Sequence, residues 1–583
     1  MGRAAGGGWL FPGAAGLVVW LAIGGLAGAQ AAHLGAPGRD PRAASAAWWV
    51  EDFADGAAGW GLEGALRPGG HTREPIEQAP SVVLRPGGWM THALPAGGVA
   101  VSLDVLLRPR TSLEVAVRPG GGWVLSRSGG AAVSVSGFGA HARLRGRPWR
   151  SGGWRHLELV TGAGAGLALD GRRVAGGPPG GATLALRSRR GALDVAAVVA
   201  SARSAPSGLL LERLTEVHAH LRARSFPVAQ TAGGRLVLGR GWTIGFWPGA
   251  LWQASELAPT TSLFSGWALP ATLSVMGHER EDTHDLGFIY GTSAQAAYDR
   301  LCAGPGGGGR PAACGRLRSS ALTAARSLVG LAGTNAAAGM LPTRARGCAQ
   351  GCRGPGQADT IVDSMMNLPI LLWARDQTGD PRFAQVASRS ARRVAQLLVR
   401  PDGSTIQSVH VGRADGRVVL KHTHQGISAS STWARGQGWA VYGFAQTATA
   451  LRDPGLLQVA ERTAQYVAGH LPASGVPRWD YAAGPGAPVD VSAGAITAAG
   501  LFALARGCAA LPGTCAQGER WAPLGRRMLA AALGRARTAA PIGYLGDEVY
   551  DLHSHTAWKR RAELVFGLHY ALDALNRQSA AGP

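Results

Sequence analysis

Residues 358–378, ADTIVDSMMNLPILLWARDQT, form a long apolar segment with an acid, Asp363, in its interior. Apolar residues recur at helical spacing, so the segment is expected to be a helix with one face packed into a core. These residues are Ile361, Val362, Met365, Leu368, Leu371 and Leu372. Asp359 and Thr360 are suited to cap the start of that helix. Asp363 and Asn367 lie four residues apart and should share a face.

Asp363 is the candidate general acid of this segment. Almost everything around it is apolar, so its carboxyl is either buried with partners or lines a cavity. Loss of water raises the pKa of a carboxyl and keeps it protonated nearer neutral pH. A general acid needs that property. For this segment taken alone, a structural acid bonded to backbone or to an Arg is the alternative.

The composition predicts several folded domains and a basic surface. The chain has 583 residues, of which 46% are hydrophobic and 16% charged, and a net charge of +22. Nearly all of the positive charge is Arg, because Lys421 and Lys559 are the only lysines. Such a surface favours nucleic acid, anionic membrane or acidic polysaccharide as partners. No basic run is interleaved with aromatic residues, so we expect no nucleic-acid partner.

Residues 1–31 are expected to be a signal peptide and residues 32–47 a Gly/Pro/Ala-rich linker. Arg3 precedes a short apolar core, Leu17 to Ile23, and small residues follow it. The apolar run is too short for a good transmembrane helix, so no stable membrane span is expected. The predicted location is secreted or extracytoplasmic.

Six cysteines form three close pairs along the chain, which favours disulfides in an oxidising compartment. The pairs are Cys302 and Cys314, Cys348 and Cys352, and Cys508 and Cys515. Zinc is the weaker interpretation, because no second Cys or His pair follows Cys348 and Cys352 at finger spacing. Spacing alone leaves the connectivity open.

Residues 48–203 are predicted to form an antiparallel β-sandwich. Short apolar runs such as Val99–Leu107 and Ser112–Val117 alternate with Gly, Pro and Arg clusters. The stretch from Glu51 to Gly56 resembles the opening strand of concanavalin- or laminin-G-like domains, and Leu167 to Gly171 resembles their hairpin with an Asp-Gly turn. Such domains often bind glycans, so polysaccharide binding is expected here, with a structural spacer as the alternative.

Residues 208–583 are predicted to be helical. About a dozen amphipathic segments are joined by aromatic, Gly-rich loops, which favours a helical toroid over a bundle. The loops carry Trp, His, Asp, Arg and Gln, a set that suits the apolar faces and hydroxyl rims of sugars. Arg435 could pair with a carboxylate through two nitrogens. Each Trp taken alone would more often be a core residue.

Several motifs in order resemble the unsaturated glucuronyl hydrolases, glycoside hydrolase family 88. They are GFWPGALW at 245–252, HDLGF at 284–288, IVDSMMNLPILLWA at 361–374, THQG at 423–426 and WARGQGWAVYGF at 433–444. The resemblance covers roughly residues 208–575 and implies an all-α six-hairpin (α/α)6 toroid behind the β-sandwich.

The resemblance implies a glycoside hydrolase that hydrates the 4,5 double bond of unsaturated uronic acids at the non-reducing end of lyase-generated oligosaccharides. Asp363 matches the family's general acid/base, and Asp285 matches its second essential acid. An acidic oligosaccharide is the implied partner, with no cofactor and no metal ligand. The matching substrate-binding positions are Gln425, Trp433, Arg435, Trp439 and Trp247.

Departures from the family pattern bear on specificity, among them Gly567-Leu568-His569-Tyr570 where the family has Gly-Asp-Tyr. Ile406 and Gln407 stand where the family usually has an aromatic residue and then a His. The Cys348 to Cys352 region replaces a Trp that stacks on substrate. Two alternatives stay open. One is a related hydrolase of unsaturated rhamnogalacturonan products, and the other is a non-catalytic protein that binds acidic glycans on the same fold.

Overall fold

The computed structural model describes most of residues 206–580, and between residues 48 and 202 it describes the strands and little of the loops. The gaps after residue 206 are 222–223, 232–234, 260, 304–311, 350, 353, 355 and 536–544. The expected signal peptide and linker lie outside the described residues, as do the turn at Asp170–Gly171 and the stretch from Asp52 to Trp60.

The N-terminal part contains two antiparallel sheets that share one core. The strands are β1 (Trp48–Glu51), β2 (Gly61–Glu63), β3 (Leu66–Pro68), β4 (Val82–Leu84), β5 (Trp89–Ala93), β6 (Val99–Leu106), β7 (Thr111–Arg118), β8 (Gly121–Arg127), β9 (Val133–Gly137), β10 (Ala140–Leu144), β11 (Trp154–Val160), β12 (Gly166–Leu169), β13 (Arg172–Gly176), β14 (Thr183–Arg190) and β15 (Leu193–Ala202). One sheet has the order β13-β12-β11-β6-β15-β4-β3 with β1 beside β15, and the other β10-β9-β8-β7-β14-β5-β2.

Alternation explains how these strands bury one face. Leu103 and Val105 of β6 are fully buried in the same apolar cluster as Leu113 and Val115 of β7, which belongs to the other sheet. Residues two apart on a strand point to the same side, so each sheet contributes one apolar face. The strands predicted from Val99 and from Ser112 are therefore confirmed.

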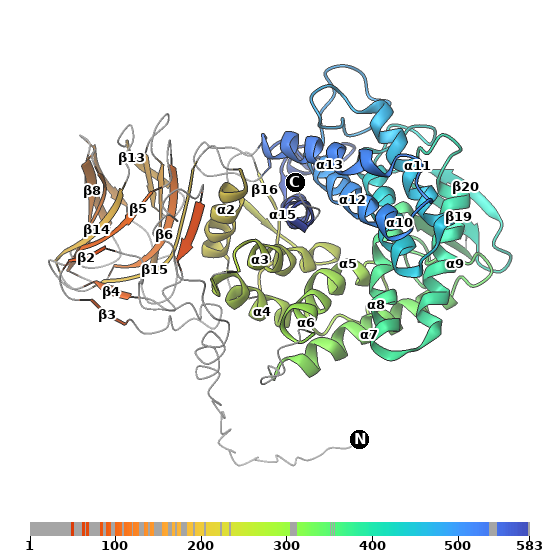
Figure 1. Ribbon diagram of the computed structural model, residues 1–583, viewed down its shortest axis with the longest axis horizontal. Coiled ribbons are helices and arrows are strands. Elements are labelled where there is room, and N and C mark those ends of the chain that lie inside the picture. The colour runs from red at the N-terminus through yellow and green to blue at the C-terminus, as the bar shows by residue number, and fades with distance from the viewer. Residues whose placement is uncertain are drawn as a thin grey trace, which may run out of the picture. The chain divides into compact units, whose positions relative to one another are not determined.

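The rest of the chain is mainly helical (Figure 1). The helices are α2 (Pro206–His220), α3 (Phe246–Leu257), α4 (Leu263–Val275), α5 (Leu286–Tyr290), α6 (Ala296–Leu301), α7 (Cys314–Gly333), α8 (Pro369–Thr378), α9 (Pro381–Leu398), α10 (Ala434–Leu451), α11 (Pro454–His470), α12 (Val491–Ala510), α13 (Gly518–Leu533), α14 (Ala557–Arg560) and α15 (Val565–Ala580). Helix α15 packs against both α12 and α3, so the last helix contacts the beginning of the helical part. Among the described helices, α12 alone is long and apolar enough to cross a membrane, but 72% of its apolar window is buried.

The segment 358–378 is not the single helix that its periodicity predicts. It consists of strand β18 (Gln357–Ile361), the 3-10 helix η4 (Val362–Asn367) and α8. Strand β18 pairs with β19 (Ser408–Gly412), which pairs with β20 (Val418–His422). Pro369 has no N–H to continue the preceding turns and starts α8 at its first position, where a missing N–H is tolerated.

That break corrects two expectations. Asp359 and Thr360 do not cap a helix, because both lie in strand β18 and Ile361 occupies the position before η4. Asp363 and Asn367 do not form a helical i, i+4 pair, because a 3-10 helix has three residues per turn. Residues 357–361 form a strand because they pair with β19. Helical periodicity within one segment carries no information about such pairing.

The three close cysteine pairs are disulfide-bonded. The bonds join Cys302 to Cys314, Cys348 to Cys352 and Cys508 to Cys515. Each closes a short loop, since the sequence separations are 12, 4 and 7 residues.

Candidate active site

Asp363 lies at the second position of η4, directly after strand β18. The backbone N–H of Val362 donates to the carbonyl oxygen of Gln407 at 2.9 Å, which holds the start of η4 on the neighbouring strand. The Asp363 Oδ1 atom is buried and accepts no hydrogen bond from a residue that the structure describes. This carboxylate is therefore held by its backbone, and one of its oxygens has its hydrogen-bonding capacity unused.

Burial raises the pKa of Asp363 to about 6. The positive charges of His284 and Arg435 oppose that rise, and the negative charge of Asp285 adds to it. The proton is thus retained to a higher pH than on an ordinary Asp, as a general acid requires.

Asp285 is connected to the η4 segment through His284. His284 Nδ1 lies 2.9 Å from Ser364 Oγ, beside Asp363, and His284 Nε2 lies 3.3 Å from Asp285 Oδ1. Thr283 Oγ1 donates to the other Asp285 oxygen at 2.8 Å. The His284 imidazole therefore joins Asp285 to Ser364, the residue that follows Asp363, and His284 was not among the predicted site residues.

A close contact between α5 and η4 sets the distance between the two acids. Asn367 Oδ1 accepts a hydrogen bond from the N–H of Phe288 at 2.7 Å. A Cβ atom at Gly287 would lie 2.3 Å from the Asn367 Cα, so only glycine permits this approach. Asp285 precedes α5 and Asp363 lies in η4, so this contact fixes one relative to the other.

Gln407 organises the THQG loop. Its Oε1 accepts hydrogen bonds from Thr423 Oγ1 at 2.6 Å and from the N–H groups of His424 and Gln425 at 3.0 Å each. Its Nε2 donates to Gln425 Oε1 at 2.8 Å and lies 3.1 Å from His424 Nε2. Gln407, noted above only as a departure from the family pattern, is therefore a buried positioning residue.

We expect Gln407→Leu to lower the free energy of unfolding by about 1–3 kcal/mol, because the partly buried donors of Thr423, His424 and Gln425 lose their acceptor. The KM should rise as the loop moves. Gln407→Glu should raise the KM less than Gln407→Leu, because a carboxylate oxygen can accept the same hydrogen bonds. Gln437→Leu is the matched control, since Gln437 is also buried but donates to the carbonyls of Gly403 and Thr463. Urea unfolding and steady-state kinetics measure both effects. An unchanged KM in Gln407→Leu would contradict the positioning role.

Arg435 is engaged by protein acceptors. Its Nη1 lies 3.1 Å from Asp490 Oδ2 and also donates to the carbonyl of Val549, and its Nη2 donates to the carbonyl of Tyr550 at 2.7 Å. The guanidinium also lies 4.5 Å from the centre of the Trp433 ring. Both Nη atoms thus hold the chain in place, and binding of a substrate carboxylate by Arg435 stays a prediction.

The predicted tryptophans are mostly enclosed. Trp247, Trp433 and Trp439 are 2%, 4% and 0% exposed. Trp439 packs edge-on against Phe288, with 5.2 Å between the ring centroids, so it is a core residue in this structure. Its contact with substrate stays a prediction.

Two aromatic residues beside these groups were not among the predicted site residues. Trp242 is partly exposed and donates from Nε1 to the hydroxyl of Tyr550 at 2.8 Å. The carbonyl of Tyr550 accepts from Gln425 Nε2 at 2.7 Å as well as from Arg435. Trp242 begins the 3-10 helix η2 (Trp242–Gly245), directly before the helix α3 that contains Trp247. Tyr550 belongs to a C-terminal segment that carries no local signal of its role.

The raised pKa predicts an acid-favoured activity. Activity carried by protonated Asp363 should fall about tenfold per pH unit above about pH 6. The free energy of unfolding should also fall as pH rises. The folded state binds the Asp363 proton more tightly than the unfolded state, so the stability that this proton contributes is lost between the ordinary Asp range and about pH 6.

A pH profile of kcat/KM tests this expectation. His284→Gln removes a positive charge that lowers the pKa of Asp363, so the falling limb should move to higher pH. His470→Gln, at an exposed position on α11, is the control and should leave the limb in place. If His284→Gln does not move the falling limb of the pH profile, that limb reports the titration of a group other than Asp363.

Comparison with known proteins identifies relatives of this chain. The chain is 34% identical over 294 residues to the unsaturated glucuronyl hydrolase of Bacillus sp. (strain GL1), covering 48% of this chain and 72% of that protein. It is 30% identical over 269 residues to the unsaturated chondroitin disaccharide hydrolase of Streptococcus pyogenes serotype M1, covering 45% and 62%. The crystal structure of the Bacillus sp. GL1 enzyme matches with a TM-score of 0.55 and 28% identity over 64% of this chain and 94% of that one. No family model matches the sequence.

These relatives place the chain among the glycoside hydrolases. The chain belongs to the unsaturated glucuronyl hydrolase family.

Proposed function

We propose that the chain releases unsaturated uronic acids from the non-reducing end of lyase-generated oligosaccharides by hydrating the 4,5 double bond, with Asp363 as general acid and base. The observation that carries this assignment is the buried Oδ1 of Asp363, which has no hydrogen-bond partner among the described residues, in a carboxyl whose pKa is raised to about 6. A carboxyl in that environment can donate a proton near neutral pH and then take one back.

The proposed reaction consumes one water. The Asp363 proton goes to C4, and the positive charge left at C5 is shared with the ring oxygen. The Asp363 carboxylate then takes a proton from water as the water oxygen bonds to C5. The resulting hemiketal opens and releases the remaining sugar. Asp285, held by Thr283 and His284, keeps the geometry of this step.

The substrates of related proteins indicate the substrate class. An unsaturated glucuronyl hydrolase 28% identical to this chain has been solved with dGlcA-Glc-Rha-Glc, and one 25% identical is specific for heparin. We propose an acidic oligosaccharide with a terminal unsaturated uronate for this chain too. Gln425, with Trp242 and Tyr550 beside it, is our candidate for contact with the sugar, because all three side chains are partly exposed. We retain Trp433, Arg435, Trp439 and Trp247 as candidate positions from the family resemblance.

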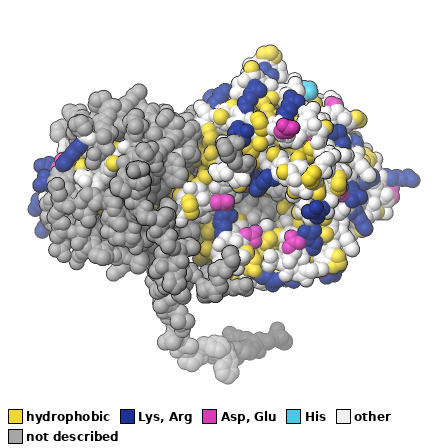
Figure 2. All heavy atoms as spheres, viewed as in Figure 1, with side chains coloured by type: hydrophobic (Ala, Val, Ile, Leu, Met, Phe, Trp, Pro, Cys, Tyr) yellow, Lys and Arg dark blue, Asp and Glu magenta, His cyan; other side chains and the backbone are white. Residues whose placement is uncertain are grey.

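Positive charge is spread over the helical part of the chain. On the face shown in Figure 2, Lys and Arg side chains are scattered over the helical part of the chain. With a net charge of +22, the surface attracts polyanionic chains at long range, and salt screens this attraction over about 10 Å at 0.1 M.

We further propose the finer architecture, with residues 48–203 as a β-sandwich that binds polysaccharide and residues 208–583 as an (α/α)6 toroid. The shared core of the two sheets supports the first part. In the second part α5, α8, α10, α12, α15 and α3 each pack against the next, and η3 (Gly291–Gln295) lies between α3 and α5. Three disulfides support a secreted or extracytoplasmic location.

Turnover of unsaturated disaccharides from chondroitin, heparin and hyaluronan lyase digests tests the proposal. Hydration removes the double bond, so ultraviolet absorbance should fall with time for at least one of them. Unsaturated rhamnogalacturonan disaccharide is the comparison substrate and should react more slowly. A folded protein that leaves the absorbance of all of them unchanged would contradict the proposal.

A further inference from the structure

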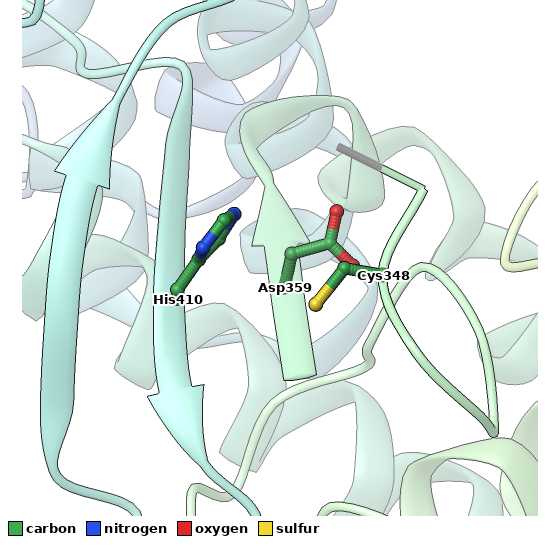
Figure 3. Close-up of side chains that lie close together, drawn as sticks. All are labelled: Cys348, Asp359 and His410. Carbon is green, nitrogen blue, oxygen red and sulfur yellow. The ribbon is translucent and has the colours of Figure 1, made fainter. Parts of the chain in front are cut away.

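Three potential metal ligands meet on the sheet that leads into the site. Asp359 on β18 and His410 on β19 are directly opposite partners in the antiparallel pairing, and their exposures are 0% and 1%. Cys348 approaches them from the loop before β18 (Figure 3). The ligand atoms of the three residues all lie within 4.8 Å of one another. Within the described residues no other group of three or more Cys, His, Asp and Glu side chains has this arrangement.

The loop is anchored on both sides of Cys348. Arg413 donates from Nη2 to the carbonyl of Gly347 at 3.1 Å, and the N–H of Ala349 donates to Thr343 Oγ1 at 3.2 Å. The same Thr343 hydroxyl donates to Asp359 Oδ1. The position of Cys348 beside Asp359 is therefore held by hydrogen bonds.

His410 has an outer partner of its own. Its Nε2 lies 2.8 Å from Nε2 of His422 on β20. Hydrogen bonds to ligand side chains from such outer partners orient them in protein metal sites. Thr343 acts on Asp359, and His422 acts on His410, in that way.

Once the Cys348–Cys352 disulfide is reduced, the negative charges of this group favour binding of a divalent cation. In the structure Cys348 is bonded to Cys352, and a disulfide sulfur is a poor metal ligand. A thiol or phosphine reductant supplies two electrons, the S–S bond breaks, and two protons give two thiols. Loss of the Cys348 proton then places a thiolate, on a partly buried residue, beside the buried Asp359 carboxylate, which is unfavourable without a counter-charge.

We propose that reduction of the Cys348–Cys352 disulfide opens a zinc site formed by Cys348, Asp359 and His410. Thiolate, imidazole and carboxylate are all zinc ligands, and three protein ligands leave a fourth position open. Spacing did not predict this site, because Asp359 and His410 are brought together by strand pairing across 51 positions of sequence.

Zinc bound at this site would stabilise the backbone segments that carry Asp363 and Asp285. Asp359 lies four residues before Asp363. The N–H of Thr343 donates to the Asp359 carbonyl at 2.9 Å, and the Thr343 carbonyl accepts from the N–H of His284 at 3.0 Å. Bound zinc should therefore raise the melting temperature of the reduced protein.

Zinc titration of the metal-depleted full chain by calorimetry tests the proposal independently of catalysis. Cys352→Ser frees Cys348 permanently, so it should bind one zinc per chain without reductant. Wild type should bind zinc only after reduction, and Cys348→Ser should bind none in either state. Cobalt should give a thiolate charge-transfer absorption in the same proteins that bind zinc. Adding Asp359→Asn to Cys352→Ser should weaken binding by about tenfold or more.

Cys508→Ser is the matched control, because it frees Cys515, which belongs to no such ligand group among the described residues. Without reductant it should bind no zinc. Absence of stoichiometric binding by Cys352→Ser would overturn the proposal. Equal affinity in Cys348→Ser or Cys508→Ser would also overturn it, since any free thiol would then suffice.

Discussion

Asp363→Asn should lower kcat by about 10²–10⁴-fold while leaving the fold intact, because the amide keeps the shape of the carboxyl but cannot donate and recover a proton. The carboxylate sits at the start of η4 with a buried Oδ1, so the side chain is placed by the backbone. Removing its charge should not disturb its neighbours.

Stability should change in the opposite direction to activity. At pH 7 most of the native Asp363 is ionised against a pKa of about 6 that burial has raised. A neutral Asn avoids holding a charge in that setting, so the free energy of unfolding at pH 7 should rise by about 1–3 kcal/mol. Urea unfolding and disaccharide turnover on the same preparation measure the two effects.

Asp376→Asn is the matched control for this change. It makes the same substitution at an exposed position on α8 and should alter neither kcat nor stability beyond about 0.5 kcal/mol. Full activity in a folded Asp363→Asn protein would remove the catalytic assignment.

Arg435→Leu should destabilise the protein by about 3–5 kcal/mol, because it leaves the fully buried Asp490 without its cation. The carbonyls of Val549 and Tyr550 lose a donor at the same time. Adding Asp490→Asn to Arg435→Leu should recover part of this loss, since no unpaired charge then remains. Urea unfolding of the two single variants and the double variant measures this coupling.

Arg435 should also act on Asp363 at a distance. Its positive charge lowers the pKa of Asp363, so Arg435→Leu should move the falling limb of the pH profile to higher pH. Arg435→Lys keeps the charge and should leave the limb near its place, while the fork of hydrogen bonds is lost. Destabilisation below about 1 kcal/mol in Arg435→Leu would show that the pair with Asp490 is not a structural requirement.

The sequence by itself indicated the strand-rich and helical parts of the chain, and it indicated the family with its candidate acids. Alternating apolar residues define strands such as β6 and β7, because side chains on a strand alternate between its faces. Ordered motifs containing Asp285 and Asp363 indicated the family, and the comparison with the Bacillus relative shows it. These signals are local, so they survive without knowledge of tertiary contacts.

Only the tertiary structure decided what surrounds those acids. Pairing with β19 turned the expected start of a helix into β18, and it also placed Asp359 beside His410. Arg435 pairs with Asp490, and Gln407 binds the THQG loop, through contacts between residues distant in sequence. A residue's spacing in sequence reports its periodicity within one element, whereas its hydrogen-bond partners depend on which elements the folded chain brings together.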